Sequence, residues 1–243
     1  MNLAHRQAAY DVRLEWGPTG AAAVAAPVAV VVDVLSFTTT LSVAADRGIT
    51  VYPFRWKDER AAAYAAERGA VLATGRSQRE GVSLSPVSVR ESVGVERLVL
   101  PSPNGSAISV ALAEAGAEVV GASLRNRSAV ARRLAGRGGA VAVVAGGERW
   151  PDGSLRPAVE DLWGAGALIA ALVDLGVGGL SPEARLAERA FRAVEPHLAD
   201  ELAACASGRE LAAIGFAGDV AVAAELDGSD VVPVLTHGAF EAG

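Results

Sequence analysis

The run at residues 28–32, closed by Asp33, constrains the fold of this chain more than any other stretch. Residues 28–40 read V-A-V-V-V-D-V-L-S-F-T-T-T. A strand with one solvent-exposed face alternates apolar and polar residues, whereas an unbroken apolar run rich in β-branched residues indicates a strand buried on both faces, as in a parallel sheet. The run therefore predicts an α/β protein in which helices cover both faces of a mainly parallel sheet.

Asp33 would lie at the carboxyl end of this strand, where open α/β sheets bind ligands. A bare buried carboxylate is costly, so it must be paired, hydrogen-bonded or metal-bound. Thr38, Thr39 and Thr40 would then open a helix whose free N–H groups suit an anion such as phosphate. From these residues alone two interpretations stay open: a functional site, or residues that only cap a turn and a helix.

Other short apolar runs alternate with helical patterns along the chain. Strands are expected at residues 10–16, 50–54, 70–74, 97–100, 118–122, 140–145 and 231–235. Helices are expected at residues 38–48, 57–68, 107–115, 128–135, 157–173, 181–204, 207–213 and 220–226, and a loop at residues 75–89. Two β-α-β units, over residues 28–54 and 50–74, predict that the strand at residues 50–54 pairs in parallel with the strands at 28–32 and 70–74, and an antiparallel strand is expected at an edge of the sheet.

The composition excludes several classes of protein. The net charge is -6 and the pI is near 5.2, and no Lys/Arg cluster could follow a nucleic-acid backbone. Apolar runs are too short or too interrupted by charge to cross a membrane. Cys205 is the one cysteine, which excludes an internal disulfide and a Cys-based zinc cluster, and we expect a cytoplasmic protein. Residues 1–243 are expected to form a single α/β domain; a two-lobed arrangement and a homo-oligomer stay open.

Two further regions place polar residues where strands end. The turn Asn104-Gly105-Ser106 joins a strand to a helix, and its glycine and free N–H groups could either bind an anion or merely cap the helix. Glu148 follows the strand at residues 140–145, as Asp33 follows the first. Glu160 and Asp161 open an apolar helix, where acids either serve a site or complement the helix dipole.

Several of these stretches, in this order, resemble one family. They are D-V-L-S-F-T-T-T at residues 33–40, S-P-N-G-S at 102–106, S-L-R-N-R-S-A-V-A at 123–131, E-D-L-W-G-A-G-A at 160–167 and G-F-A-G-D-V-A-V-A-A-E-L-D-G-S-D-V-V-P at 215–233. The ordered set, which spans most of the chain, resembles the 2-phosphosulfolactate phosphatases. The resemblance implies an α/β enzyme that uses magnesium to hydrolyse a phosphate monoester of sulfolactate, a small phosphorylated acid, on the way to coenzyme M.

The resemblance also implies roles for the acids. Magnesium takes oxygen ligands and keeps several waters, so one to three acids from separate loops can hold it. Asp33, Glu160 and Asp161 are the expected Mg²⁺ ligands, with Glu148 in reserve. Asp33 and Asp161 are the expected catalytic residues. Asp33 could attack phosphorus to form an aspartyl-phosphate or act as the base for water, and both mechanisms stay open.

Two turns are expected to bind the substrate's phosphate. Thr38, Thr39 and Thr40 would offer hydroxyl and N–H groups from one side, and Asn104, Gly105 and Ser106 from the other.

The chain departs from the family pattern at three places. The family usually has an arginine where this chain has Ser36, before Phe37, and a cation for phosphate or sulfonate is therefore missing. The family also has an acid where this chain has Arg76, so Arg76 or Arg79 could supply that cation and bind substrate. Gly164 replaces a usual cysteine.

These departures keep other functions open, since a fold tolerates such changes more readily than a substrate preference does. One alternative is a phosphatase for a different small phosphorylated acid, and another is a non-catalytic ligand-binding homologue. A nucleotide-binding Rossmann protein is disfavoured because no G-x-G-x-x-G follows the first strong strand.

Overall fold

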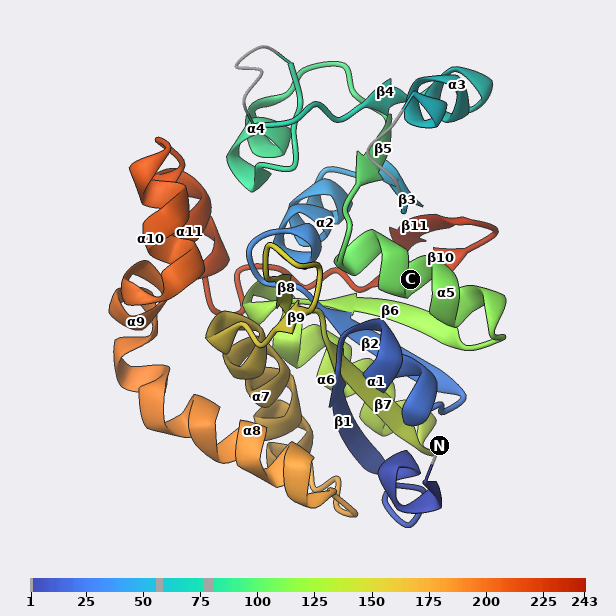
Figure 1. Ribbon diagram of the computed structural model, residues 1–243, viewed down its shortest axis with the longest axis vertical. Coiled ribbons are helices and arrows are strands. Elements are labelled where there is room, and N and C mark those ends of the chain that lie inside the picture. Colours follow the sequence, from blue (N-terminus) through green and yellow to red (C-terminus); the bar gives the residue numbers. More distant parts are fainter. Residues whose placement is uncertain (1, 56–58, 77–80) are drawn as a thin grey trace.

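The structure is a computed structural model that describes residues 2–55, 59–76 and 81–243 (Figure 1). Among these residues one sheet has nine strands in the order β1-β7-β2-β6-β10-β11-β3-β5-β4, and β8 and β9 pair separately. The strands are β1 (Val12–Trp16), β2 (Val28–Val32), β3 (Thr50–Phe54), β4 (Val71–Leu72), β5 (Arg97–Pro101), β6 (Glu118–Ala122), β7 (Val141–Ala145), β8 (Glu148–Arg149), β9 (Leu155–Arg156), β10 (Pro233–Thr236) and β11 (Ala239–Ala242).

Helices surround the large sheet, which confirms the predicted α/β class (Figure 1). The α-helices are α1 (Gly17–Ala23), α2 (Phe37–Asp46), α3 (Arg60–Glu67), α4 (Pro86–Glu91), α5 (Gly105–Glu114), α6 (Arg127–Arg137), α7 (Val159–Asp174), α8 (Pro182–Val194), α9 (Leu198–Ala204), α10 (Ala206–Ala213) and α11 (Ala217–Ala223). Short 3₁₀ turns lie at Leu3–Arg6, Leu124–Asn126 and Glu195–His197.

β2 lies inside the sheet with both faces buried, as its sequence predicted. Val28, Val30 and Val32 pack in one hydrophobic cluster with residues of α6 and α7, whereas Ala29 and Val31 pack in a second cluster with residues of α2 and α5. β2 pairs in parallel with both β6 and β7. A slip by one residue would exchange the two sets of side chains, so burial on both faces fixes the register. The carboxyl end of β2 is therefore held in one place.

The antiparallel strands lie in the middle of the sheet, so the prediction of an antiparallel strand at an edge is wrong. β1 at one edge pairs in parallel with β7, and β4 at the other edge pairs in parallel with β5. β10 pairs antiparallel with β6 and β11, and β11 pairs antiparallel with β3. Three successive reversals make β3, β5 and β4 run opposite to β1, β7, β2 and β6.

The expected pairing of successive strands is also wrong for two pairs. β6, β10 and β11 separate β2 from β3, and β5 separates β3 from β4. Hydrophobic runs reveal a buried strand, but the choice of neighbour depends on contacts between distant segments.

Three elements of the sheet and its cover were not predicted: α1, α4 and β11. α4 begins inside the segment expected to be a loop and ends two residues beyond it, with Ser85 as N-cap accepting the N–H of Ser88 and Pro86 in the first turn. These signals are present in the sequence, but the helix of six residues is too short to show a period. The expected helix at residues 57–68 appears as α3, and its first residues, like Arg79, lie outside the described residues.

Arg125 attaches the segment before β10 to α2. It is 4% exposed, and its guanidinium donates hydrogen bonds to the side chains of Glu225, Ser42 and Asp46 and to the carbonyl of Gly228 at 3.0 to 3.3 Å. All of its nitrogens are thus used inside the protein, which offsets the cost of burying a cation. The sequence marked this arginine only as part of a family stretch.

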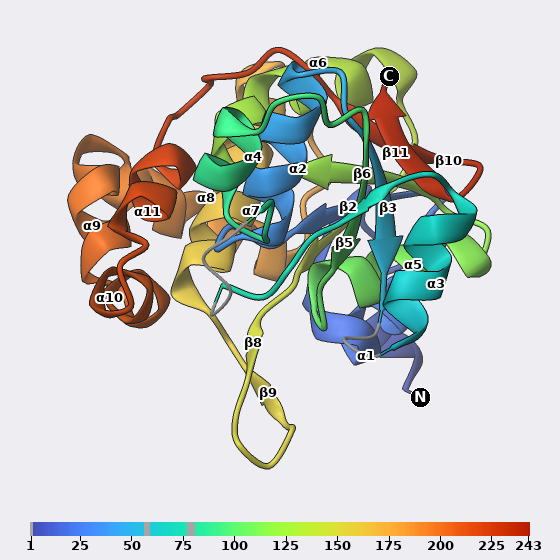
Figure 2. The ribbon, with the colours of Figure 1, turned by 90° about the horizontal axis from the view of Figure 1, so that it is seen from above.

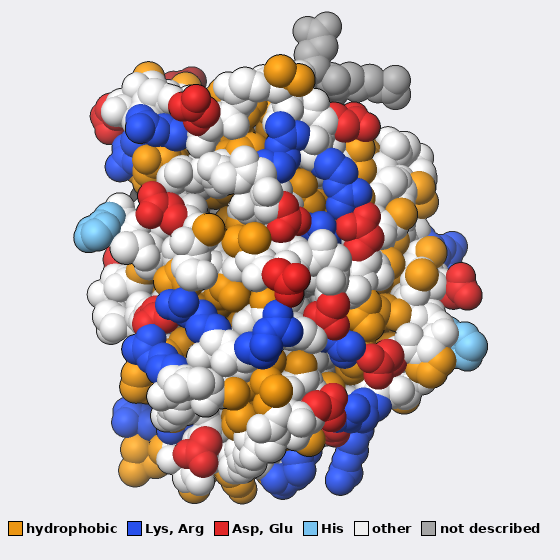
Figure 3. Space-filling view, turned by 180° about the vertical axis from the view of Figure 1, so that it is seen from behind, with side chains coloured by type: hydrophobic (Ala, Val, Ile, Leu, Met, Phe, Trp, Pro, Cys, Tyr) orange, Lys and Arg blue, Asp and Glu red, His pale blue; other side chains and the backbone are white. Residues whose placement is uncertain are grey.

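The surface mixes charges of both signs. On the face seen in Figure 3, basic and acidic side chains are interspersed. The β8–β9 hairpin projects from the body of the protein (Figure 2). In the ranges that the structure describes, no helix combines the length and apolar character needed to cross a lipid bilayer.

Candidate active site

The carboxylate of Asp33, directly after β2, joins the starts of two helices. Its Oδ1 accepts the N–H of Phe37 in α2 at 3.2 Å, and its Oδ2 accepts the N–H of Gly105 in α5 at 2.9 Å. The side chain is buried. Helix N-termini attract anions through their free N–H groups. The sequence predicted an incoming phosphate for these turns, whereas here they hold the protein's own carboxylate.

The predicted phosphate-binding hydroxyls are turned inward. Thr38, Thr39, Thr40 and Ser106 are all buried, and each donates its hydroxyl proton to a backbone carbonyl at 2.7 to 2.9 Å. The acceptors, in the same order, are the carbonyls of Asp33, Val34, Leu84 and Leu100. These protons are therefore already used to fix the two turns. The predicted role in phosphate binding stays a prediction.

Asp161 anchors the first turn of α7 to two loops. Its Oδ1 accepts the N–H of Val34 and its Oδ2 accepts the N–H of Gly147, both at 2.7 Å. Gly146 lies between the two aspartates, because a Cβ on it would come 3.2 Å from Asp33 Cβ and 3.6 Å from Asp161 Oδ2. The loops after β2 and β7 and the start of α7 thus meet at one place.

Glu160 and Glu148 are the other acids at this place. Glu160 is 2% exposed, and its Oε2 has no hydrogen-bond partner among the described residues. The thiol of Cys205 donates to the carbonyl of Leu202 at 3.2 Å, and burial together with the charge of Glu160 raises the pKa of that thiol to about 11. Glu148 accepts a hydrogen bond from Asn104 Nδ2 at 3.1 Å. A buried carboxylate oxygen without a partner is unfavourable unless a proton, a cation or a water meets it.

Burial and the repulsion of neighbouring carboxylates raise the pKa values of Asp33, Glu148 and Asp161. Burial raises the pKa of Asp33 to about 6, against the lowering effect of its two N–H donors. Burial and the negative charge of Asp33 raise the pKa of Glu148 to about 7. Burial, Asp33 and Glu160 raise the pKa of Asp161 well above its usual range. Because these carboxylates repel one another, the site favours the binding of protons or of a cation.

Without added metal, part of the free energy of unfolding is expected to be lost as the pH rises from about 5 to about 8. The pKa of Glu148 is near 4.5 ordinarily and about 7 in the folded protein. The folded state keeps this proton where the unfolded state has lost it, so the stabilisation is complete below the ordinary pKa and disappears through the raised one. Glu148→Gln should remove on the order of 2 kcal/mol of this pH dependence. Urea unfolding in EDTA at about pH 5 and about pH 8 measures the free energy of unfolding of the wild type and of Glu148→Gln. The same loss of stability with pH in the two proteins would contradict this prediction.

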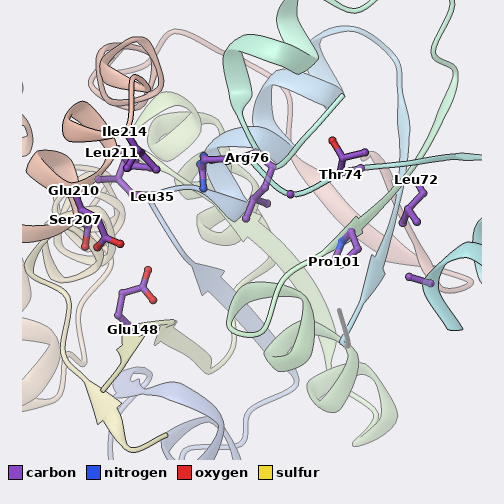
Figure 4. Close-up of a pocket in the computed structure, with 14 residues that line it drawn as sticks. Leu35, Leu72, Thr74, Arg76, Pro101, Glu148, Ser207, Glu210, Leu211 and Ile214 are labelled. Carbon is purple, nitrogen blue, oxygen red and sulfur yellow. The ribbon is translucent and has the colours of Figure 1, made fainter. Parts of the chain in front are cut away.

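A pocket of about 560 Å³ opens beside the acids (Figure 4). Its lining includes Glu148, Arg76 from the loop after β4, and Leu211 from α10. In Figure 4 the guanidinium end of Arg76 points away from Thr74, toward the side on which Glu148 and Leu211 lie. The volume is within the range of about 300 to 1,000 Å³ usual for small-molecule sites. The pocket thus offers one ligand a cation, an acid and apolar surface.

The structure brings together most of the predicted site residues. Asp33, Asn104 and Gly105, Glu148, Glu160 and Asp161 lie around the same loops, and Arg76 lines the adjoining pocket. Sequence reasoning missed Asp219, a buried acid that accepts hydrogen bonds from Arg76 at 3.3 Å. Its place in the first turn of α11, inside one of the family-like stretches, was a signal, but an acid there is also a common dipole complement.

The acids do not form a preassembled ligand set. Among residues 2–55, 59–76 and 81–243, no group of three or more His, Cys, Asp and Glu side chains is arranged to hold a metal ion.

Comparison with known proteins gives consistent matches along the chain. A family model described as 2-phosphosulpholactate phosphatase matches residues 18–238. A probable 2-phosphosulfolactate phosphatase of Deinococcus radiodurans is 31% identical over 220 residues, which cover 87% of this chain and 88% of that protein. A probable 2-phosphosulfolactate phosphatase of Thermotoga petrophila is 30% identical over 220 residues, which cover 87% of this chain and 90% of that protein.

Proposed function

The chain belongs to the 2-phosphosulfolactate phosphatase family, a family of phosphoric monoester hydrolases, and on that premise we propose that it hydrolyses 2-phosphosulfolactate to sulfolactate and phosphate. The observation that carries the proposal is a pocket of suitable size that Glu148 and Arg76 line, together with the buried carboxylate of Asp33, whose pKa responds to the charge of Arg76 and whose own charge raises the pKa of Glu148. We place this reaction in the cytoplasm, in the type of pathway that leads to coenzyme M.

We infer that the reaction depends on Mg²⁺, because the donors present fit this ion. Asp33, Glu148 and Glu160 offer hard oxygen ligands, Glu160 Oε2 is buried without a partner, and a cation would relieve the repulsion that raises their neighbours' pKa values. Mg²⁺ keeps several waters, so one or two carboxylates suffice without a preassembled set. Asp33 and Glu160 would hold it, and when bound it would neutralise charge on the phosphoryl oxygens.

Asp33 is the residue that acts on phosphorus in this proposal. It lies where two helix starts meet, and its charge is supported by the N–H groups of Phe37 and Gly105 and by the nearby Arg76. It can attack phosphorus directly or take a proton from the attacking water. Both steps need the ionised carboxylate. The proposed reaction is therefore the same whether Asp33 attacks phosphorus or takes the proton from water.

Glu148 and Arg76 act on the two ends of the substrate. Glu148 lines the pocket with a pKa of about 7, so near neutral pH it can carry the proton that the departing alkoxide needs. Arg76 supplies a cation for an acid group of the substrate, in place of the arginine that Ser36 replaces. Its Nη2 donates to Ser36 Oγ at 2.6 Å, which puts the guanidinium beside the altered position.

Asp161 and Asn104 position the reacting groups. Both oxygens of Asp161 accept backbone N–H groups, which fits the fixing of loops better than direct contact with the substrate. Asn104 holds Glu148 through its side-chain amide.

Phosphate release from 2-phosphosulfolactate tests the proposal. Turnover is expected with Mg²⁺, and EDTA should lower it at least about 100-fold, with recovery on adding back Mg²⁺, since a metal ion contributes several kcal/mol of charge stabilisation. A panel of other small phosphorylated acids runs alongside. Turnover of another acid but not of this one would make the chain a phosphatase with a different substrate. Tight binding of the ester without release of phosphate would make it a ligand-binding member of the family.

A further inference from the structure

Asp219 is a buried carboxylate whose two oxygens are both engaged. It is 1% exposed and lies in the first turn of α11. Its Oδ2 accepts hydrogen bonds from Nε and Nη2 of Arg76, both at 3.3 Å, and its Oδ1 accepts one from the hydroxyl of Ser85. A buried charge needs such partners, so Asp219 is held firmly by α4 and by the loop after β4.

The described residues hold Arg76 along one edge of its guanidinium. Besides Asp219, its Nη2 donates to Ser36 Oγ at 2.6 Å and to the carbonyl of Leu84 at 3.3 Å, and the ring of Phe216 lies 5.5 Å from its Cζ. Nη1 makes no hydrogen bond with the described part of the chain. Because the guanidinium is planar, fixing Nε and Nη2 also fixes the direction of the remaining N–H groups.

The free edge of Arg76 belongs to the pocket. The side chain is 17% exposed and lines the cavity that Glu148 also lines (Figure 4). Its charge reaches Asp33, because Arg76 counteracts part of the rise in the pKa of that carboxyl. A ligand acid group at Nη1 would thus lie near a phosphate that reacts at Asp33.

We propose that Asp219 is the positioning residue that orients Arg76 to select phosphate monoesters carrying a second acid group. This inference rests on the proposed function. Asp219 does not touch the substrate; it fixes the plane of the guanidinium so that two N–H groups face the pocket. Without its charge, the flexible side chain of Arg76 would sample several directions, and binding of the second acid group would weaken while phosphoryl chemistry continued.

Asp219→Asn tests the proposal in the full-length protein with Mg²⁺. The KM for 2-phosphosulfolactate is expected to rise at least about 10-fold while kcat changes less than about 3-fold, because uniform binding energy is lost. Phenyl phosphate, which has no second acid group, should be turned over as by the wild type. Glu225→Gln is the matched control, since it removes a carboxylate that pairs with Arg90 and Arg125 outside the pocket, and should leave both substrates unaffected.

Chemical rescue separates positioning from a structural role. Added guanidinium ion should restore 2-phosphosulfolactate turnover to Arg76→Ala, but not to the double variant Arg76→Ala/Asp219→Asn, because Asp219 must hold the ion. Asp219→Glu keeps the charge but moves it, and it replaces the asparagine variant if that variant does not fold. It should raise the KM for 2-phosphosulfolactate but not the KM for phenyl phosphate.

The outcomes distinguish this inference from the function it rests on. Equal losses on both substrates, an unchanged KM, or equal rescue in both backgrounds would overturn the role of Asp219 while leaving the phosphatase assignment intact. If the wild type binds 2-phosphosulfolactate without hydrolysing it, the proposed function is wrong. The role of Asp219 is then tested by calorimetry, where Asp219→Asn is expected to raise the Kd for 2-phosphosulfolactate at least about 10-fold. An ester that is neither bound nor hydrolysed overturns both.

Discussion

Asp33→Asn is expected to lower kcat for phosphate release by about 10³-fold, because the amide can neither attack phosphorus nor accept the proton of water. The substitution also costs some stability. One of the two N–H groups that Asp33 accepts, from Phe37 and Gly105, would face the amide NH₂, at a cost of about 1 to 3 kcal/mol. Activity must therefore be measured on protein shown to be folded by circular dichroism.

Asp161→Asn is the matched control for this loss. Asp161 also accepts two backbone N–H groups, so its amide variant suffers the same conflict and a similar loss of stability. If Asp33 acts only by fixing loops, the two variants should lose similar activity. A much smaller loss in Asp161→Asn supports a direct role for Asp33, and full activity in folded Asp33→Asn removes it from the mechanism.

Gly166→Ala is expected to lower the free energy of unfolding by about 3 kcal/mol, since overpacking between α7 and α8 forces the helices apart. A Cβ at Gly166 would come 2.1 Å from the carbonyl oxygen of Ala187 and 2.8 Å from Phe191 Cβ. The obstruction is largely backbone, which cannot rotate away. Urea unfolding followed by circular dichroism measures the change.

Gly136→Ala is the matched control, and it should have the opposite sign. Gly136 is an exposed residue of α6, and a Cβ there would meet nothing within 4 Å. Alanine then gains only its higher helix propensity, worth about 0.5 to 1 kcal/mol. Equal effects of the two substitutions would contradict the close contact of α7 with α8.

The buried strands were the easiest part of the fold to predict. β2, β3 and β6 were predicted almost to the residue, because each is a short apolar run bounded by turn signals, and β2 is also rich in β-branched residues. The order of strands could not be predicted, since β10 and β11 enter the sheet after some 230 residues of chain, and no local pattern records the partner of a strand.

The candidate site was predictable in its members but not in their contacts. Acids at strand ends and a glycine turn can be recognised in the sequence alone. The segments that hold Asp33, Asn104 and Asp161 do converge in the structure. The sequence could not show that Asp33 itself fills the helix-end anion position, or that Asp219 holds Arg76. Both depend on pairs of residues 72 and 143 positions apart.

The central place of β10 and β11 has a consequence during synthesis on the ribosome. These two strands are the latest of the sheet in chain order, yet they join the group that contains β6 to the group that contains β3. Until residue 242 has left the ribosome, β10 and β11 cannot join the sheet. The edges of β6 and β3 that these strands cover then stay open, and open strand edges are prone to pairing with other chains. Stalled or shortened polypeptides should therefore depend on chaperones far more than the finished protein does.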